Sequence, residues 1–272
     1  MISIALPDSM FLEDDSLGKK NAKVGQLARS AAIFGVERIY IYRDSSHDYE
    51  SDYLLAKTIL EYAETPQYLR KRMFGKRKEL DFAGLLPPLR TPHHLVEPVP
   101  VEGQVREAVI LLQGGQLVAD VGFRELAKFE GRAHEGQRTT VEVVSVNPLL
   151  VKSCEKPKGK YWGYEVRRAP SLARFLNSAK FAMTILTSRI GAPLWESWAE
   201  FQGMVKAAET ILVCYGSPVS GLDRILAQER AKVSDFPKAK YLNFFPFQNA
   251  ETIRLEEAVL GSLSILNLAV HL

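Results

Sequence analysis

Two loops, one with two glycines and a proline and the other with a proline, each after a short apolar strand, constrain the fold of this chain more than any other feature. Residues 211–215 (ILVCY) have the pattern of a buried strand, and Gly216-Ser-Pro-Val-Ser-Gly221 follows as a tight turn. A second loop, Asn243-Phe-Phe-Pro-Phe-Gln-Asn-Ala-Glu-Thr252, leads into a helical run that reaches Leu268. Open α/β sheets bind ligands at such loops, beside the carboxyl ends of strands. The sequence therefore predicts an α/β domain with a ligand pocket between these loops.

The two loops lack the phosphate-binding sequences of the common nucleotide sites. Neither G-x-G-x-x-G nor G-x-x-x-x-G-K-[ST] occurs in the chain, which disfavours a nucleotide-dependent dehydrogenase. A pocket without a phosphate cradle suits a ligand that is held by its adenine, ribose and amino-acid groups.

Composition is that of an ordinary globular protein of a reducing compartment. The 272 residues, 46% of them hydrophobic, can bury a full core in one large or two modest domains. Cys154 and Cys214 cannot build a disulfide framework, and no metal-binding spacing is present. The N-terminus does not resemble a signal peptide, and no stretch is long enough to span a membrane. We therefore expect a cytoplasmic protein with no membrane partner.

Two basic segments make nucleic acid a candidate partner, although the net charge is only +3. Residues 70–78 (RKRMFGKRK) are densely basic, and residues 152–168 combine basic side chains with aromatic ones. Basic groups neutralise phosphates, and aromatic faces stack on bases. A solvated basic face explains the same residues, so both interpretations stay open at this point. The candidate RNA contacts are Arg70, Lys71, Arg72, Lys158, Lys160, Tyr161, Trp162 and Arg167.

The chain alternates between strand and helix patterns at its N-terminal end. Residues 2–6 and 36–42 are predicted strands, and residues 19–35 and 49–64 are predicted helices. This order implies a parallel sheet. Helices are also predicted at 171–187 and 193–208.

The pattern changes to closely spaced short strands after a proline-rich link at residues 85–94. Strands are predicted at 105–112, 116–121, 139–146 and 161–167. Such spacing is typical of a small antiparallel barrel of oligonucleotide-binding type. The simplest account is one discontinuous α/β domain (1–94 and 169–272) with an inserted barrel (95–168). Three consecutive small domains are the alternative, but the first segment has too few strands to close a core.

Three segments together resemble the motifs of the SPOUT superfamily of RNA methyltransferases. Residues 23–36 (KVGQLARSAAIFGV) are similar to the first motif, a helix that carries a catalytic arginine, here Arg29. Residues 211–222 resemble the second motif and residues 245–255 the third. Residues 86–94 (LPPLRTPHH) resemble the signature of an archaeal and eukaryotic branch of RNA methyltransferases, and this likeness covers nearly the whole chain.

This resemblance implies a fold and a chemistry that composition does not show. It implies a Rossmann-like parallel sheet with a C-terminal trefoil knot, an exception to the general rule against knots. The implied cofactor is S-adenosyl-L-methionine, held in the knot loops, and the inserted barrel is expected to help bind RNA. Ribosomal RNA is the expected substrate class, and superfamily members are usually homodimers with active sites near the interface.

Glycines and polar groups of the two loops are the expected cofactor contacts. Gly216 and Gly221 let the backbone close around adenosine without a Cβ in the way, although an ordinary turn uses glycines in the same manner. The expected contacts are Gly216, Ser217, Gly221, Asn243, Phe245, Pro246, Phe247, Gln248, Asn249 and Thr252.

Two arginines are candidates for the catalytic group. The resemblance assigns this role to Arg29, whose guanidinium can orient a phosphate or stabilise a developing oxyanion. Arg90, in the proline-stiffened link, is the second candidate; a surface arginine and a linker arginine paired with a carboxylate are the plain alternatives. His93 and His94 point to opposite sides if the link is a strand, so they make a poor metal pair.

Two departures from the superfamily pattern leave the methylated atom open. Pro218 stands where many ribose-methylating relatives carry Glu, and Arg254 stands where Asn is expected. A ribose 2′-oxygen and a base nitrogen both remain compatible with the chain. The sequence therefore predicts an S-adenosylmethionine-dependent RNA methyltransferase. The alternative is an RNA-binding protein that keeps the fold without turnover.

Overall fold

The computed structural model describes residues 1–95 and 97–271, and the chain divides into two compact units. The α/β unit consists of Met1–Glu61, Asp81–Pro87 and Tyr164–Leu272. The barrel unit consists of Tyr62–Leu80 and Pro88–Gly163. The inserted unit therefore begins earlier than expected, since residues 62–80 and 88–94 group with the barrel. Among the described residues, no helix has the length and apolar character needed to cross a membrane.

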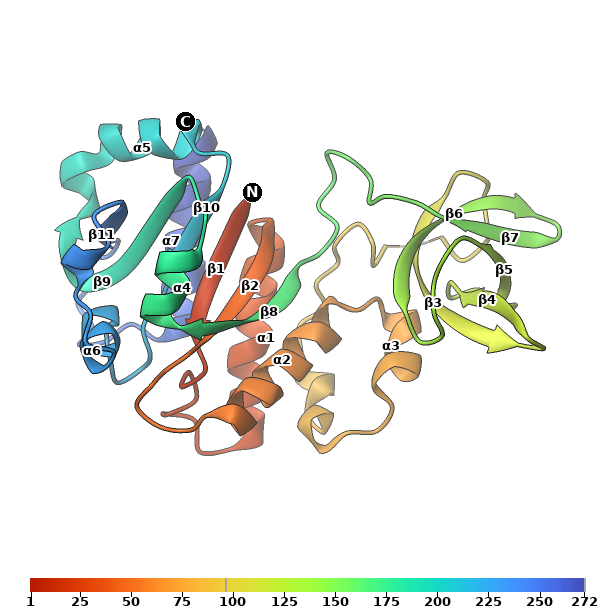
Figure 1. Cartoon of the computed structure of the whole chain (residues 1–272), viewed down its shortest axis with the longest axis horizontal. Helices are drawn as coiled ribbons and strands as arrows, with labels where there is room; N and C mark the ends of the chain where they lie inside the picture. Colours follow the sequence, from red (N-terminus) through yellow and green to blue (C-terminus); the bar gives the residue numbers. More distant parts are fainter. Residues whose placement is uncertain (96, 272) are drawn as a thin grey trace. The chain divides into compact units, whose positions relative to one another are not determined.

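The α/β unit is built on a six-stranded sheet with the order β11-β9-β10-β1-β2-β8 (Figure 1). Every neighbouring pair is parallel, which confirms the predicted parallel α/β sheet. All four residues of β10 are buried, as expected for a central strand covered on both faces. The strands are β1 (Ile2–Pro7), β2 (Val36–Arg43), β8 (Glu165–Ser171), β9 (Met183–Pro193), β10 (Ile211–Cys214) and β11 (Ala239–Asn243).

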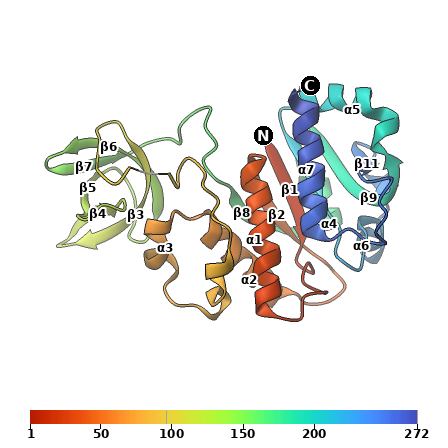
Figure 2. The ribbon, with the colours of Figure 1, turned by 180° about the vertical axis from the view of Figure 1, so that it is seen from behind.

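Helices cover both faces of this sheet. Helices α1 and α7 run side by side over one face (Figure 2), and α4 and α6 lie over the other (Figure 1). Ser16 caps α1 through its hydroxyl, and the Glu229 carboxylate accepts hydrogen bonds from the first N–H groups of α4. The helices are α1 (Leu17–Ile33), α2 (Glu50–Glu64), α4 (Leu172–Ser178), α5 (Trp198–Ala207), α6 (Leu222–Gln228) and α7 (Leu255–His271).

Two predicted elements in this part of the chain were wrong. The predicted helix at 171–187 ends at Ser178, and the strand β9 begins at Met183. The apolar residues at the start of β9 fit the helical period and the strand period over so short a run, but the β-branched Thr184 and Ile185 favour a strand. The predicted barrel strand at 161–167 is instead β8, which pairs with β2. Local alternation of side chains does not specify which strand is the partner.

The barrel unit contains a closed five-stranded barrel with the order β3-β4-β5-β7-β6. Small and β-branched side chains such as Ala108, Ile110 and Val141 fill its interior. The contact between β5 and β7 is parallel and the others are antiparallel. The strands are β3 (Val105–Gln113), β4 (Gln116–Asp120), β5 (Ala127–Glu130), β6 (Arg138–Val146) and β7 (Leu149–Ser153), and the helix α3 (Gln67–Phe74) belongs to the same unit. Strands β5 and β7 were not predicted.

A buried cluster of charged side chains lies inside the barrel unit. Arg138 donates from Nε to Glu107 (2.6 Å) and from Nη1 to Glu64 (2.5 Å). Glu107 also accepts hydrogen bonds from the Thr140 hydroxyl (2.8 Å) and the Trp162 indole (2.7 Å). Burial by itself raises the pKa of Glu107, but the Arg138 charge and these hydrogen bonds hold it below its ordinary value. Within the described residues, Arg138 pairs with both carboxylates, and His93 Nε2 also lies 3.1 Å from Oε1 of Glu64.

Both histidines of the proline-rich link approach the same acceptor. The Nε2 atoms of His93 and His94 lie 3.0 Å and 2.6 Å from the carbonyl oxygen of Glu64. The prediction that they point apart was wrong, because the link forms a turn here rather than a strand. Burial lowers the pKa of His94 to about 4.

Candidate active site

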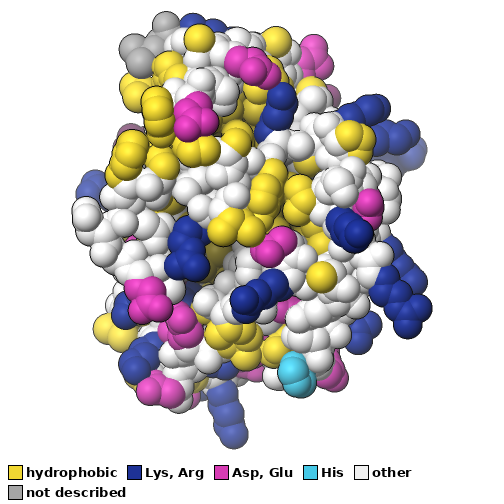
Figure 3. Space-filling view, turned by 90° about the vertical axis from the view of Figure 1, so that its left-hand side faces the viewer, with side chains coloured by type: hydrophobic (Ala, Val, Ile, Leu, Met, Phe, Trp, Pro, Cys, Tyr) yellow, Lys and Arg dark blue, Asp and Glu magenta, His cyan; other side chains and the backbone are white. Residues whose placement is uncertain are grey.

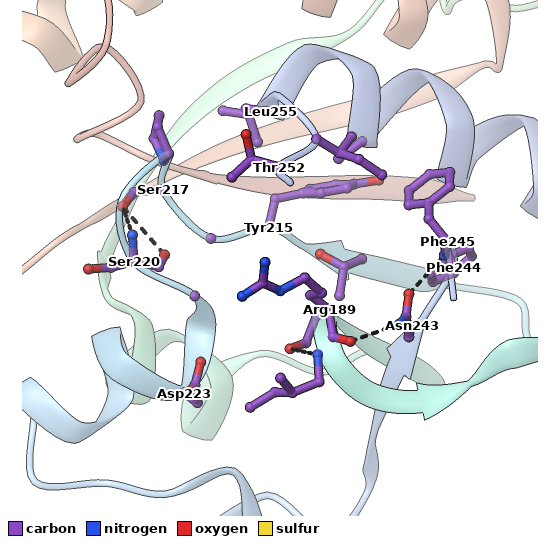
Figure 4. Close-up of a pocket in the computed structure, with 18 of the residues that line it drawn as sticks. Arg189, Tyr215, Ser217, Ser220, Asp223, Asn243, Phe244, Phe245, Thr252 and Leu255 are labelled. Carbon is purple, nitrogen blue, oxygen red and sulfur yellow. Dashed lines mark hydrogen bonds between the residues drawn. The ribbon is translucent and has the colours of Figure 1, made fainter. Parts of the chain in front are cut away.

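A pocket of about 410 Å³ opens at the carboxyl edge of the sheet, where β9, β10 and β11 end (Figure 4). The loop after β10 and the loop after β11 both line it, so the two predicted loops meet in one cleft. Of the predicted cofactor contacts, Gly216, Ser217, Gly221, Asn243, Phe245, Gln248 and Thr252 line this pocket, whereas Pro246, Phe247 and Asn249 do not.

The first loop presents its backbone closely to the pocket. A Cβ added at Gly216 would lie 2.7 Å from the carbonyl oxygen of Ser220 and 3.1 Å from Cα of Gly221. The turn is closed by Ser217 N–H donating to Ser220 O (2.8 Å), and Ser220 N–H donates to the Ser217 hydroxyl (3.0 Å). The Ser217 hydroxyl therefore serves the turn, and the wall that faces a ligand is mostly backbone.

The polar side chains of the second loop also hold the protein's own backbone. Asn243 donates from Nδ2 to the carbonyl of Arg189 (2.8 Å), and its Oδ1 accepts from Phe245 N–H (2.8 Å). Gln248 donates from Nε2 to the carbonyls of Ala250 (2.9 Å) and Glu251 (3.2 Å). These amides shape the pocket, whereas we expected them to bind the ligand directly.

An irregular segment of β9 supplies a wall that the sequence did not predict. Tyr241 pairs with Leu186, and the next residue, Leu242, pairs with Ala192, so residues 187–191 bulge out of the pairing with β11. The bulge brings Arg189 into the pocket. Residues 187–191 (TSRIG) lie in the region predicted to be helical or just beyond it, which is why they gave no signal.

The floor of the pocket is fixed by a buried tyrosine. Tyr215 follows β10, and its hydroxyl lies 2.5 Å from the Ser262 hydroxyl of α7. Its carbonyl accepts a hydrogen bond from the Tyr42 hydroxyl (2.7 Å). Burial raises the pKa of Tyr215 above its ordinary value, so the phenol stays protonated. This pairing ties the floor of the pocket to α7.

Comparison with known proteins identifies the chain. Residues 1–266 match the model of the family described as "Putative RNA methyltransferase". The chain belongs to this family. It is 32% identical to an uncharacterized protein of Halobacterium salinarum, over 98% of both chains. It is 31% identical to the human 28S rRNA (uridine-N(3))-methyltransferase, over 97% of this chain and 77% of the human one. A Drosophila melanogaster protein of the same name is 30% identical over 97% of this chain and 61% of its own length. The family and these relatives make the chain an RNA-methylating enzyme, which requires a methyl donor.

The two predicted catalytic arginines of the methyltransferase lie outside the residues that line this pocket. Arg29 is half-buried on α1. Arg90 is exposed in the barrel unit and has a left-handed backbone with φ 53°. Their catalytic roles stay predictions.

Several predicted RNA contacts of the methyltransferase already serve its own fold. Arg70 donates to the carbonyls of Ala63 and Thr65 at the end of α2, and Arg72 pairs with Asp120 at 2.8 Å. Arg167 pairs with Glu165 at 2.7 Å. Trp162 is 8% exposed and its indole is hydrogen-bonded to Glu107, so little of its ring faces solvent, and its role in stacking on RNA stays a prediction. Lys71, Lys158 and Lys160 are exposed, and Tyr161 is half-buried.

Two buried carboxyl groups follow β1 and β2 at the same edge of the sheet. Asp8 and Asp44 are each 2% exposed. Asp44 N–H donates to Asp8 Oδ1 (2.8 Å), and the Ser9 hydroxyl donates to Asp44 Oδ2 (2.6 Å). Burial, reinforced by the Asp44 charge, raises the pKa of Asp8 from 3.8 to about 6. At neutral pH the fold therefore holds Asp8 in its less favoured, ionised form.

We expect Asp8→Asn to stabilise the methyltransferase at pH 8 by about 3 kcal/mol. Because the carboxyl pKa is higher in the folded state, ionisation of Asp8 destabilises the fold above about pH 6 and has no effect below about pH 4. Asparagine keeps the acceptor for Asp44 N–H and removes the charge. Urea unfolding at pH 4.5 and pH 8 measures the difference, with Asp81→Asn as the exposed control. A gain that does not depend on pH would contradict this account.

Proposed function

We propose that the protein transfers a methyl group from S-adenosyl-L-methionine to N3 of a uridine in ribosomal RNA. The observation that carries this proposal is the alignment of nearly the whole chain with relatives named 28S rRNA (uridine-N(3))-methyltransferases in human, mouse and fly. The chain aligns with them across both compact units, so the likeness includes the pocket as well as the barrel. Of the two target atoms compatible with the sequence, these names favour the base nitrogen.

The pocket fits S-adenosylmethionine in its shape and in its donor groups. Gly216 and Gly221 let the turn after β10 close on itself, because a Cβ at either position would meet atoms of the same turn or of Asp223, and both glycines line the pocket with backbone groups that can pair with an adenine edge. Tyr215 and Phe245 add apolar surface, and Asp223 offers a carboxylate to hydroxyl or ammonium groups. When bound, the cofactor supplies an electrophilic methyl group on a sulfonium. The residues of the chain bind it, orient it and exclude water from it.

We also propose that the C-terminal segment forms a trefoil knot. β11 is at the edge of the sheet, whereas α7 packs against α1 and α5. Residues 244–254 must therefore cross the edge of the sheet beside the bulge of β9 and the loop after β10. Arg189, which donates to the Glu251 carbonyl at 3.0 Å, ties this crossing segment to the bulge. This arrangement favours a knot in which residues 244–254 thread between the bulge of β9 and the loop after β10.

A homodimer is the assembly that we propose for the α/β unit. Near the pocket, Ile190, Trp195 and Phe247 are 69%, 59% and 76% exposed, and the rings of Trp195 and Phe247 are 6.2 Å apart. In Figure 3, hydrophobic side chains gather in the upper part of this face, and basic side chains are scattered over its middle and along its right-hand edge. An apolar surface of this kind favours association with a second copy. Light scattering at micromolar concentration tests the assembly.

In the barrel unit, we propose that the exposed lysines contact the RNA backbone. Lys71, Lys158 and Lys160 are exposed and form no ion pair with the residues that the structure describes, and the half-buried Tyr161 follows Lys160 in the chain. The five-stranded closed barrel is consistent with an oligonucleotide-binding type. Lysine contacts to phosphates are independent of base sequence and weaken with salt, so the barrel supplies affinity rather than base selection.

Methylation of unmodified RNA tests the proposed function. Purified protein, S-adenosylmethionine with a labelled methyl group and large-subunit rRNA transcribed in vitro are incubated, and the RNA is digested to nucleosides. We expect labelled 3-methyluridine, which chromatography separates from 2′-O-methyluridine. Labelled 2′-O-methyluridine as the product would contradict the choice of target atom. Cofactor binding without transfer to any rRNA would favour an RNA-binding protein without turnover.

A further inference from the structure

We infer that Arg189 is a catalytic residue that binds the target uracil and stabilises the negative charge left when N3 loses its proton. This inference rests on the proposed uridine-N3 activity. It assigns the selection of the base to the bulge of β9, a feature that the sequence motifs of the pocket do not include.

The bulge is held in place by specific contacts. A Cβ added at Gly191 would lie 2.8 Å from the carbonyl carbon of Leu242 and 2.9 Å from its nitrogen. Only glycine therefore allows the strand to rejoin β11 so closely after the bulge. Asn243 binds the Arg189 carbonyl from the other side, at 2.8 Å. Bulges next to active sites commonly redirect a side chain, and here the redirected side chain is Arg189.

The guanidinium of Arg189 extends into the pocket and forms no ion pair with the described residues. In Figure 4 it lies between Tyr215 and Thr252 on one side and Asp223 on the other. Its one hydrogen bond within the described residues runs from Nη1 to the neutral carbonyl of Glu251 (3.0 Å), and it forms no ion pair with them. The remaining N–H groups are available to a ligand with oxygen acceptors.

Charged and titratable groups from every wall of the pocket determine the field around Arg189. Asp223 and Arg224 come from α6, Glu251 from the loop before α7 and Tyr215 from the end of β10. The Tyr215 phenol stays neutral because burial raises its pKa. Asp223, Glu251 and Arg224 are the charged side chains that line the pocket together with Arg189.

Uracil fits this cation because its N3–H lies between two carbonyl oxygens. When the N3–H bond breaks, its electron pair stays on the ring, the proton passes to water, and the negative charge spreads over N3, O2 and O4. A guanidinium that binds one of these oxygens stabilises this anion more than the neutral base, so it lowers the pKa of the bound N3–H. The exposed nitrogen then faces the methyl donor.

The test compares the wild type with Arg189→Gln and Arg189→Lys in single-turnover methylation of large-subunit rRNA at saturating cofactor, from pH 6 to pH 10. Arg174→Gln, an exposed arginine on α4, controls for net charge. We expect Arg189→Gln to slow transfer at pH 7 by about 100-fold. The deficit should shrink as pH rises, because the midpoint of the rate profile moves to higher pH. The transfer rate of Arg189→Lys should lie between the rates of the wild type and of Arg189→Gln.

Two further measurements separate this role from a structural one. RNA that contains 5-fluorouridine has a more acidic N3–H, so it should reduce the deficit of Arg189→Gln by about tenfold. The affinity for S-adenosylmethionine, measured by calorimetry, should stay within about threefold of the wild type.

The outcomes distinguish failure of the inference from failure of the proposed function. If the wild type forms 3-methyluridine but Arg189→Gln keeps the wild-type pH midpoint and shows no gain with 5-fluorouridine, Arg189 does not bind the base anion. An unchanged midpoint with cofactor affinity weakened by about 100-fold would instead identify Arg189 as a ligand of the cofactor carboxylate. If the wild type forms no 3-methyluridine, both the proposed function and this inference are overturned.

Discussion

Replacing Arg138 by glutamine should lower the free energy of unfolding of the barrel unit by about 3–5 kcal/mol. Arg138 is the cation between Glu64 and Glu107, whose side chains are 8% and 4% exposed. Glutamine cannot compensate either charge, so two carboxylates would remain buried without an opposing charge. The hydrogen bonds from Thr140 and Trp162 to Glu107 would persist, but two neutral donors do not replace a guanidinium.

Hydrogen exchange of the β3 and β6 amides, together with urea unfolding, measures this loss for the barrel unit separately. Arg132→Gln, at an exposed arginine of the same unit, is the matched control and should change stability little. Adding Glu64→Gln and Glu107→Gln to Arg138→Gln should recover part of the loss, since it removes the uncompensated charges. The deficit of the single variant should also shrink as the pH falls, because burial raises the pKa of Glu107 once the Arg138 charge is gone and the carboxyl group takes up a proton. Equal protection of β3 and β6 in the variant and the wild type would show that the cluster is energetically unimportant.

The sheet of the α/β unit was predictable where local signals and the fold agree. β1, α1, β2 and α2 alternate in the chain as strand and helix patterns, and apolar periodicity predicted a helix at residues 19–35, where α1 spans Leu17–Ile33. β9 was missed because its short apolar run fits both periods, and its identity as a strand depends on β10 and β11 on either side. Pairing with strands distant in the sequence therefore determined that this segment is a strand, which its local periodicity left ambiguous.

The position of the pocket was predictable, but the roles of its side chains were not. Glycine and proline mark the loops at Gly216 and near Asn243 because few residues fit such turns. Nothing in the sequence indicates that Asn243 binds the backbone of the bulge, because that contact joins residues 54 positions apart. Arg189 gave no signal either, since it reaches the pocket through the register between β9 and β11.

In the basic segments, too, the sequence did not reveal the roles of individual side chains. Composition identified Arg70, Arg72 and Trp162 as candidates for RNA, but each has a partner inside the unit. A long side chain with a charged or polar end can satisfy the protein's own carbonyls and carboxylates as readily as a phosphate. Only the folded structure separates these residues from the exposed Lys158 and Lys160.

Gly216→Ala should weaken binding of S-adenosylmethionine by about 100-fold while the protein stays folded. The added Cβ would lie 2.7 Å from the carbonyl oxygen of Ser220 and 3.1 Å from Cα of Gly221, and backbone atoms cannot rotate away as a side chain can. The turn must therefore shift, and the backbone groups that line the pocket shift with it. Calorimetry with S-adenosylmethionine measures the loss.

Two matched variants make this result specific to the turn. Gly203→Ala, on α5 with open space around the new Cβ, should leave affinity unchanged and stabilise the helix by about 0.4–1 kcal/mol. Gly221→Ala meets only the Asp223 carboxylate, at 2.6 Å, which can rotate away, so its effect on affinity should lie between the other two. If Gly216→Ala binds the cofactor as tightly as Gly203→Ala does, the loop after β10 does not form the cofactor site. The ligand of this pocket would then be held by the bulge of β9 and the loop after β11 alone.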